Sequence, residues 1–231
     1  MKPARLLIAL LVCVTAFNLG CVPKKKTETL RNVDQLSQHP RIATYLLSAH
    51  QQEALYRVGI YWDYKLGLNQ NCTKDAQIKP GSLILLQPIV FPAGSKHPQA
   101  GAWQQRFEFE RCEGPRTYNA IFLATPGAAP QERPLPPGNT NASLQLLHDA
   151  GLAAKMAASI KFEPQPDGKK CDEIQLVGTE LTEPPHEVTK DGKTIKGAWG
   201  EAWTMNGCGQ VVTVNADFVP NDQGGTSFNF K

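Results

Sequence analysis

The chain has 231 residues, of which 41% are hydrophobic and 19% are charged, and its formal net charge is +3. This composition is typical of a globular protein and excludes a fully disordered chain, a collagen and a multi-span membrane protein. Lys2 and Arg5 lie in a segment that we expect to be removed, so the remaining chain is close to neutral. A near-neutral chain lacks the basic stripe of a nucleic-acid-binding protein, and we therefore predict no nucleic-acid partner.

Residues 1–20 have the pattern of a secretory signal peptide. A basic start is followed by an apolar run from Leu6 to Phe17, which is 12 residues long. A helix that spans a bilayer needs about 20 apolar residues, so this run is too short for a permanent anchor. It fits the core of a signal sequence instead, and we predict that residues 1–20 direct export.

The segment after the signal is Gly20-Cys21-Val22, in which a small residue directly precedes a cysteine. It resembles the bacterial lipobox, whose cysteine receives palmitate and other lipid, although the two residues before Gly20 depart from the usual pattern. The resemblance implies lipidation of Cys21. It also implies a place in the periplasm at the outer membrane, because Val22 is not the aspartate of inner-membrane retention. Secretion without lipid is the alternative, and in both cases residues 21–38 form a polar tether.

An internal repeat organises the rest of the chain. Residues 101–122 align with residues 197–218 without a gap, and eight of the 22 positions are identical. Such self-similarity indicates a tandem duplication. We predict a first α+β repeat at 39–123, a proline-rich extended linker at 124–140 and a second α+β repeat at 141–231.

The cysteines fit an oxidising compartment. Outside the signal and the lipobox, the chain has four of them, an even number that is typical of a disulfide framework: Cys72, Cys112, Cys171 and Cys208. Four cysteines allow three pairings, and the repeat favours Cys72 with Cys112 and Cys171 with Cys208. No C-x-x-C spacing is present, so we predict neither a metal site nor a redox cofactor.

Each repeat has the pattern of a helix followed by an antiparallel meander. The first helix is predicted within residues 40–66, where Gly59 is expected to bend or end it. The second is predicted within residues 141–160, with Thr140 or Asn141 as its cap. The side chains expected on one face of the second helix are Leu144, Leu147, Met156 and Ile160.

The strand patterns follow each helix. Apolar runs at 82–91 and 174–181 predict the first strand of each meander, and alternation around Trp103 and Trp199 predicts the second. Asp191-Gly192 is typical of a two-residue hairpin. A last strand is predicted after Gly224-Gly225, and the first repeat is expected to lack a counterpart of it.

Candidate functional side chains are few. None of the five histidines has a metal-ligand spacing, and no G-x-S-x-G or phosphate loop is present, so we predict no catalytic residue and leave the question of an enzyme open. Trp62 and Trp203 have no matching tryptophan in the other repeat, which makes them candidates for contact with a partner. Asn119 and Asn215 share the polar face of equivalent strands, where they either bind a partner or satisfy neighbouring backbone groups.

Trp199, Cys208-Gly209, Phe218 and the GGT at 224–226 resemble a pattern in uncharacterised secreted proteins and lipoproteins of Gram-negative bacteria. The duplicated plan is similar to that of β-lactamase-inhibitor proteins and of BamE-like outer-membrane assembly lipoproteins. This similarity is architectural, and it implies no binding residue in this chain.

We therefore predict a non-catalytic lipoprotein of the cell envelope that binds another envelope protein, through the groove between the repeats or the exposed faces of the sheets. One alternative is a periplasmic hydrolase that acts on glycan or peptide at a site between the repeats. The other is an inhibitor of a secreted enzyme. No cofactor is expected in any of these.

Overall fold

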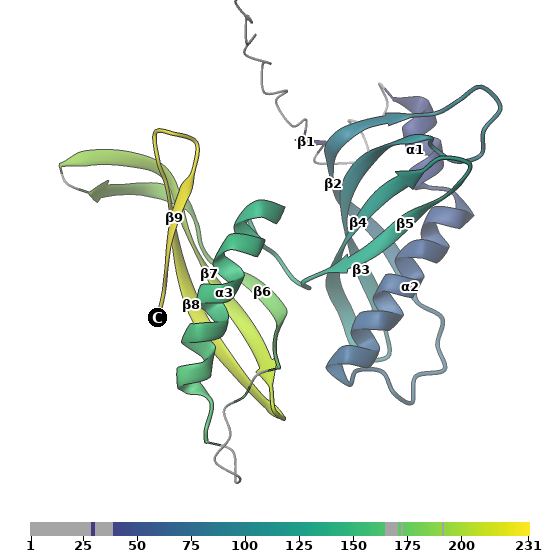
Figure 1. The fold of residues 1–231 in the computed structure, drawn as a ribbon. Coiled ribbons are helices and arrows are strands. Elements are labelled where there is room, and N and C mark those ends of the chain that lie inside the picture. Colours follow the sequence, from purple (N-terminus) through teal and green to yellow (C-terminus); the bar gives the residue numbers. More distant parts are fainter. Residues whose placement is uncertain (1–28, 31–38, 165–170, 172, 191) are drawn as a thin grey trace, which may run out of the picture.

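The computed structural model contains helices and antiparallel strands in two halves (Figure 1), which confirms the predicted mixture of the two. The predicted signal peptide, Cys21 and most of the predicted tether lie outside the residues that it describes. The described residues are 29–30, 39–164, 171, 173–190 and 192–231.

The first half contains two helices and a five-stranded antiparallel sheet. Its strands are ordered β1-β2-β3-β4-β5, so each strand pairs with the next along the chain. The elements are β1 (Thr29–Leu30), α1 (Pro40–Leu46), α2 (Ala49–Leu66), β2 (Gln77–Val90), β3 (Ala100–Arg111), β4 (Gly114–Thr125) and β5 (Ala128–Leu135).

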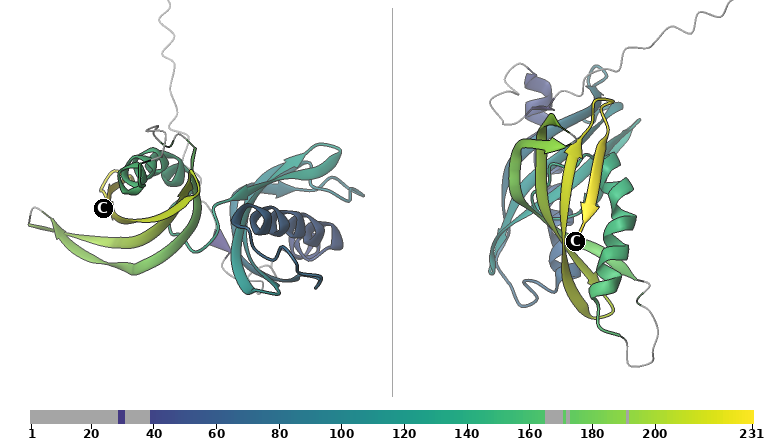
Figure 2. Two further views of the ribbon diagram at one scale, coloured as in Figure 1. Left: turned by 90° about the horizontal axis from the view of Figure 1, so that it is seen from below. Right: turned by 90° about the vertical axis from the view of Figure 1, so that its left-hand side faces the viewer.

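The second half repeats this plan with one helix and a four-stranded sheet, ordered β6-β7-β8-β9. In both halves the helix lies on the concave side of its curved sheet, and the hydrophobic core fills the space between them (Figure 2). The elements are α3 (Leu144–Lys161), β6 (Ile174–Lys190), β7 (Lys193–Gly207), β8 (Gln210–Pro220) and β9 (Thr226–Phe230).

The central strand pairs of the two sheets have the same register. Trp103 on β3 lies opposite Phe122 on β4, and Trp199 on β7 lies opposite Phe218 on β8. Both pairs of rings are stacked, with centroids 5.3 and 4.9 Å apart. Corresponding positions are 96 residues apart (199 minus 103, and 218 minus 122), and the same interval relates β4–β5 pairing to β8–β9 pairing.

The structure corrects the predicted linker at 124–140. Residues 128–135 form β5, which pairs with β4 as β9 pairs with β8, so the first half does have a counterpart of the last strand. Two prolines, Pro130 and Pro134, are tolerated because β5 lies at the edge of the sheet. No strand of the sheet pairs with the outer side of β5, so an N–H that is missing on that side costs no hydrogen bond between strands. The connector between the halves is therefore shorter and begins near Pro136.

The first predicted helix forms as two pieces. The chain breaks at Leu47-Ser48, and Ser48 Oγ then caps α2 by accepting a hydrogen bond from the Gln51 N–H at 3.3 Å. Gly59 neither bends nor ends α2, which continues to Leu66. Its role is close packing, since a Cβ at this position would lie 2.6 Å from Phe109 Cζ and still closer to other atoms of that ring.

Helix α3 begins one turn later than predicted. Its cap is Ser143, whose Oγ accepts from the Leu146 N–H at 3.1 Å, and not Thr140 or Asn141. The helix buries a face of alanines, whose small side chains let it lie close to the sheet: Ala150, Ala154 and Ala158. Met156 and Ile160, which were expected on the buried face, are exposed as a consequence.

Both predicted disulfides are present, Cys72–Cys112 and Cys171–Cys208, with Cα atoms 5.7 and 5.8 Å apart. Each bridge ties the segment after a helix to the turn between the two central strands of its own sheet. The two disulfides indicate an extracytoplasmic protein, because the cytoplasm keeps thiols reduced. Among the helices of the described residues, none is both long and apolar enough to cross a bilayer.

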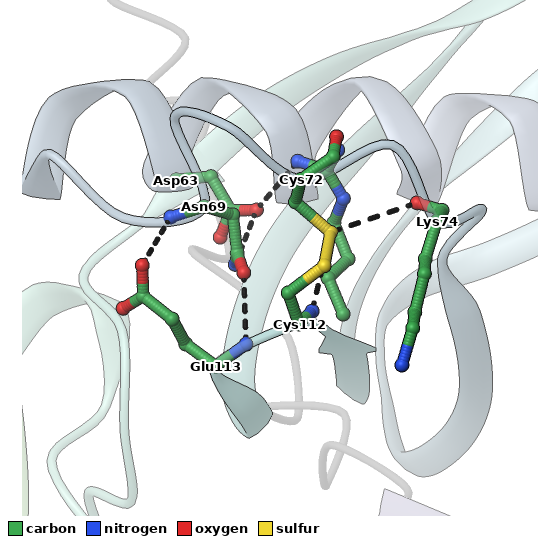
Figure 3. The surroundings of a disulfide bond; sticks show 7 residues. Asp63, Asn69, Cys72, Lys74, Cys112 and Glu113 are labelled. Atoms are coloured by element: carbon green, nitrogen blue, oxygen red, sulfur yellow. Dashed lines mark hydrogen bonds and ion pairs between the residues drawn. A yellow bond between two sulfur atoms is a disulfide. The ribbon is translucent and has the colours of Figure 1, made fainter.

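Around the first bridge, two residues clamp the chain by reciprocal hydrogen bonds (Figure 3). The Asn69 N–H donates to Glu113 Oε1 at 2.6 Å, and the Glu113 N–H donates to Asn69 Oδ1 at 3.0 Å. The clamp fixes the loop after α2 against the β3–β4 turn beside the disulfide.

The close contact at Gly59 gives a stability prediction. We expect Gly59→Ala to lower the free energy of unfolding by about 1–3 kcal/mol, because the added methyl overpacks the Phe109 ring. Urea unfolding followed by tryptophan fluorescence measures the change.

The matched control is Gly151→Ala in α3, where an added Cβ meets no atom within 4 Å. There we expect stabilisation by about 0.5–1 kcal/mol, because alanine loses less backbone entropy than glycine in a helix. Equal effects at the two positions would contradict the packing role of Gly59.

Candidate functional site

The most deeply buried charged side chain of the second half is Glu201 on β7, which has no exposed surface. Its carboxylate accepts hydrogen bonds from the indole N–H groups of Trp199 and Trp203, both at 2.8 Å. It also accepts from Thr140 Oγ1 at 2.8 Å and from the Asn141 N–H at 2.8 Å. The connector between the halves is therefore held to the core of the second half.

The first half holds the same connector from the other side. Arg106 on β3 donates from Nη2 to the Thr140 carbonyl at 3.0 Å and from Nε to Asn119 Oδ1 at 3.1 Å. Asn119 on β4 donates from Nδ2 to the carbonyls of Pro136 and Gly138, at 2.9 and 3.0 Å. Two side chains of the first sheet thus bind the carbonyls of three alternate residues in the connector.

Backbone pairing completes this contact, which we call the joint (Arg106, Asn119, residues 136–141, Thr179 and Glu201). The Thr179 N–H donates to the Pro137 carbonyl at 2.9 Å, and the Asn139 N–H donates to the Thr179 carbonyl at 2.8 Å. Gly138, with φ of 96°, has no room for a Cβ beside Thr179. Burial lowers the pKa of Arg106, and the negative charge of Glu201 opposes this.

The four predicted binding residues lie in different surroundings. Asn119 lies in the joint, where it satisfies backbone carbonyls, whereas Asn215 is exposed and only its backbone pairs, with Lys231. Trp203 is fully buried against Glu201, and Trp62 is nearly buried in the first core. A side chain without exposed surface cannot contact a partner directly, so Trp203 is not a binding residue. Trp62 keeps little surface with which to contact a partner.

Sequence reasoning did not find Glu201 or Arg106. A signal for Glu201 does exist, because it stands between Trp199 and Trp203 at an inward position of an alternating strand, where an acid is unusual. Arg106 carries no such signal, since it alternates with glutamates on a face that the pattern predicts to be wet.

A second buried acid lies in the first half beside the disulfide of Figure 3. Asp63 on α2 accepts from the Tyr118 hydroxyl at 2.8 Å, from Asn69 Nδ2 at 3.0 Å and from Arg111 Nη1 at 3.2 Å. Burial, together with the hydrogen bond and charge of Asp63, raises the pKa of Tyr118. The cluster ties α2 to β3 and β4, which is a structural task.

An open pocket of about 690 Å³ lies at the junction of α1 and α2, and the loop after β2 forms part of its wall. We call it the Arg41 pocket. The side chains that give it its chemistry are Arg41, Tyr45, His50, Phe91, Lys96 and His97. Burial raises the pKa of Tyr45 to about 12. Burial also lowers the pKa of His97, and the nearby charges of His50 and Lys96 lower it further.

The outer face of α3 carries large apolar side chains at every fourth residue. Leu152, Met156 and Ile160 are 69%, 62% and 85% exposed, and we call them the α3 ridge. Helix α2 has a related row of Tyr56, Ile60 and Tyr64, each 96 positions before its counterpart, of which Tyr64 is the most exposed. Large apolar side chains gathered on a surface are a common mark of protein–protein contact.

No protein-family model, no curated protein and no solved structure matches this chain. The resemblance to secreted proteins and lipoproteins of Gram-negative bacteria stays a prediction.

The donors around Glu201 give a second stability prediction. We expect Glu201→Ala to lower the free energy of unfolding by about 3–5 kcal/mol, because two indole N–H groups, a hydroxyl and a backbone N–H lose their acceptor in a buried place. Urea unfolding measures the change.

The exposed Glu180 on the neighbouring strand β6 supplies the control, and Glu180→Ala should change stability by less than about 0.5 kcal/mol. If the two variants unfold at the same urea concentration, the hydrogen bonds of Glu201 do not hold the second core together.

Proposed function

We propose that this chain is a non-catalytic, protein-binding module of the cell envelope, built from two copies of one helix-and-sheet unit and anchored to the outer membrane by lipid on Cys21. The observation that carries the proposal is the α3 ridge. An exported helix that buries alanines and presents leucine, methionine and isoleucine to solvent has a surface suited to a protein partner.

Several features support the duplication. Helices α2 and α3 are both 18 residues long, and each is capped by a serine side chain. Their buried faces correspond at the interval of 96 residues, with Ala54 matching Ala150 and Val58 matching Ala154. The register of the central strands has the same interval, as do Cys112 and Cys208, whereas Cys72 and Cys171 are 99 residues apart (171 minus 72). Independent origins would not be expected to give one interval for helix faces and strand pairs together.

The energetics of the α3 ridge favour an occupant. Burying one large aliphatic side chain stabilises a protein or complex by about 1.5–3 kcal/mol relative to leaving it in water. Three such side chains in successive turns match the way in which one face of a helix enters an apolar groove. Lys155 lies between two turns of the ridge, so the partner we propose has an apolar groove with an acidic rim.

The two buried acids support a non-catalytic role. Glu201 has no exposed surface and accepts from four donor groups, and Asp63 accepts from three. A carboxylate with these partners is engaged in holding the fold and is not placed to exchange protons with a substrate. The joint lies between the halves, where a site was predicted.

The α3 ridge can be tested with one triple variant. Leu152→Gln, Met156→Gln and Ile160→Gln together should weaken binding of the envelope partner by about tenfold or more, since truncated anchor residues each cost more than about 1 kcal/mol. Glutamine retains good helix propensity, so α3 should remain folded. The partner is captured from an envelope extract and purified, and its dissociation constant is then measured for each variant.

The control is a triple glutamine variant at exposed apolar positions elsewhere, Leu47, Val90 and Val211, which should bind as the parent does. Equal dissociation constants for the parent and the α3 variant would contradict the proposal. So would a parent protein that dimerises in sedimentation while the α3 variant is monomeric, because the ridge would then bind a second copy.

Lipidation has its own test in the producing cell. Cys21→Ser should abolish incorporation of labelled palmitate and move the protein from the membrane fraction to the soluble periplasmic fraction. Cys13→Ser, within the signal peptide, should leave both results unchanged. A Cys21→Ser protein that is still labelled and membrane-bound would rule out this anchor.

A further inference from the structure

The Arg41 pocket is a preformed hollow between segments that are far apart in the sequence. One wall is the α1–α2 junction and the other is the loop from Phe91 to His97. Its volume of about 690 Å³ falls within the range of about 300–1,000 Å³ that is typical of small-molecule sites. The size therefore suits a ligand with one or two rings or a short alkyl chain.

Aromatic side chains form its apolar floor. The Tyr45 ring packs edge-on against Phe91, with centroids 5.4 Å apart, and against Trp103 at 6.3 Å. The Tyr45 hydroxyl lies 3.2 Å from His97 Nδ1, which fixes the histidine ring at the side of the pocket. These contacts hold the floor in place without a ligand, so little ordering cost remains to be met on binding.

A cation is fixed at the rim. The Arg41 guanidinium lies 4.6 Å from the centroid of the Phe91 ring, and Arg41 Nη2 donates to the carbonyls of Pro92 and Ser95 at 2.8 and 3.2 Å. Both of these bonds use Nη2, and a guanidinium carries further donors on Nε and Nη1. Arg41 is thus oriented by the loop and retains donors for a planar anion.

The remaining charge of the pocket is also basic. His50 and His97 face each other with ring centroids 4.6 Å apart, and Lys96 lies beside them. Among the described residues that line the pocket there is no aspartate or glutamate. An apolar floor under a rim of basic side chains is complementary to a negatively charged group on an apolar body.

We infer that the Arg41 pocket binds an organic carboxylate with an aromatic or short aliphatic body, with the carboxylate at Arg41 and Lys96 and the body on Tyr45 and Phe91. The source of such a group is either a free small molecule or the C-terminal carboxylate of a peptide that ends in an aromatic residue. Both present the same chemistry to the pocket.

Binding should strengthen in mild acid. His97 faces Tyr45 on α1, His50 on α2 and Lys96 in its own loop, and its lowered pKa leaves it neutral near pH 7. His50 also lies within the electrostatic reach of Glu132 on β5. Protonation of His97 adds positive charge beside the carboxylate, and by linkage the bound carboxylate must raise the pKa of His97.

The probe is 2-naphthoate, with the uncharged 2-naphthamide as its matched control, titrated calorimetrically into the mature protein. We expect the naphthoate to bind about tenfold more tightly than the amide, because only the naphthoate forms charge-assisted bonds. Its affinity should increase between about pH 7.5 and pH 5.5, and the NMR titration of His97 should move to higher pH with the naphthoate alone. Equal affinities, or no binding of either probe, would overturn the inference.

Two pairs of variants separate the rim from general charge. Arg41→Gln with Lys96→Gln should weaken naphthoate binding by about tenfold or more and leave the amide unchanged. Lys190→Gln with Lys193→Gln makes the same change in net charge at exposed positions and should have no effect. If the Arg41 variant does not fold, the Lys96→Glu variant alone tests the inference. It should weaken binding of 2-naphthoate and leave binding of 2-naphthamide unchanged.

Two further experiments test which molecule supplies the carboxylate and whether the Arg41 pocket is independent of the α3 ridge. A peptide ending in phenylalanine, with a free or an amidated C-terminus, shows whether a chain end is accepted, and preference for the amidated peptide would contradict the inference. The triple glutamine variant of the α3 ridge should bind 2-naphthoate as the parent does. A loss in that variant would place the bound naphthoate on α3.

Discussion

The carboxylate of Glu201 is the constraint on which the second half and the joint depend. An ionised acid in the protein interior is tolerated only where donors replace the water it has lost. Here the donors come from two places, the indoles of Trp199 and Trp203 on the same strand and the hydroxyl and backbone of Thr140 and Asn141 in the connector. Closing the second core and positioning the connector are therefore a single event.

The corresponding position in the first half holds a neutral side chain and not an acid. Gln105 lies 96 residues before Glu201 and is also buried, but it accepts from Gln51 Nε2 at 2.9 Å within its own half. A neutral amide pair needs no donor from outside, so this position of the first half requires no hydrogen bond from the connector. The halves share strand register and helix faces but differ at this inward position, and only the glutamate of the second half binds the connector from there.

Much of the fold follows from local patterns. The alternation around Trp103 and Trp199 identifies the central strands, and the repeated cysteines select the disulfide pairing that the structure contains. The prediction that Met156 and Ile160 lie on the buried face of α3 is wrong. It rests on side-chain hydrophobicity, whereas smaller alanines pack on the sheet. Strand β5 was missed because its prolines are typical of a linker, although an edge strand accepts them. The joint and the Arg41 pocket bring together residues distant in sequence, which local periodicity does not register.

The contacts of the connector imply an order in which the two halves fold. Domains of an exported chain become available for folding from the N-terminus onward. The first half emerges with its core complete except for Val177, which β6 supplies later, and with Arg106 and Asn119 positioned to bind the carbonyls of the connector. The second half emerges last, and its buried acid finds two of its donor groups on a segment that the earlier half has already oriented. The N-terminal half thereby orients the segment on which the second half folds, and a fragment that starts beyond Asn141 would lack two of the four groups that donate to its buried carboxylate.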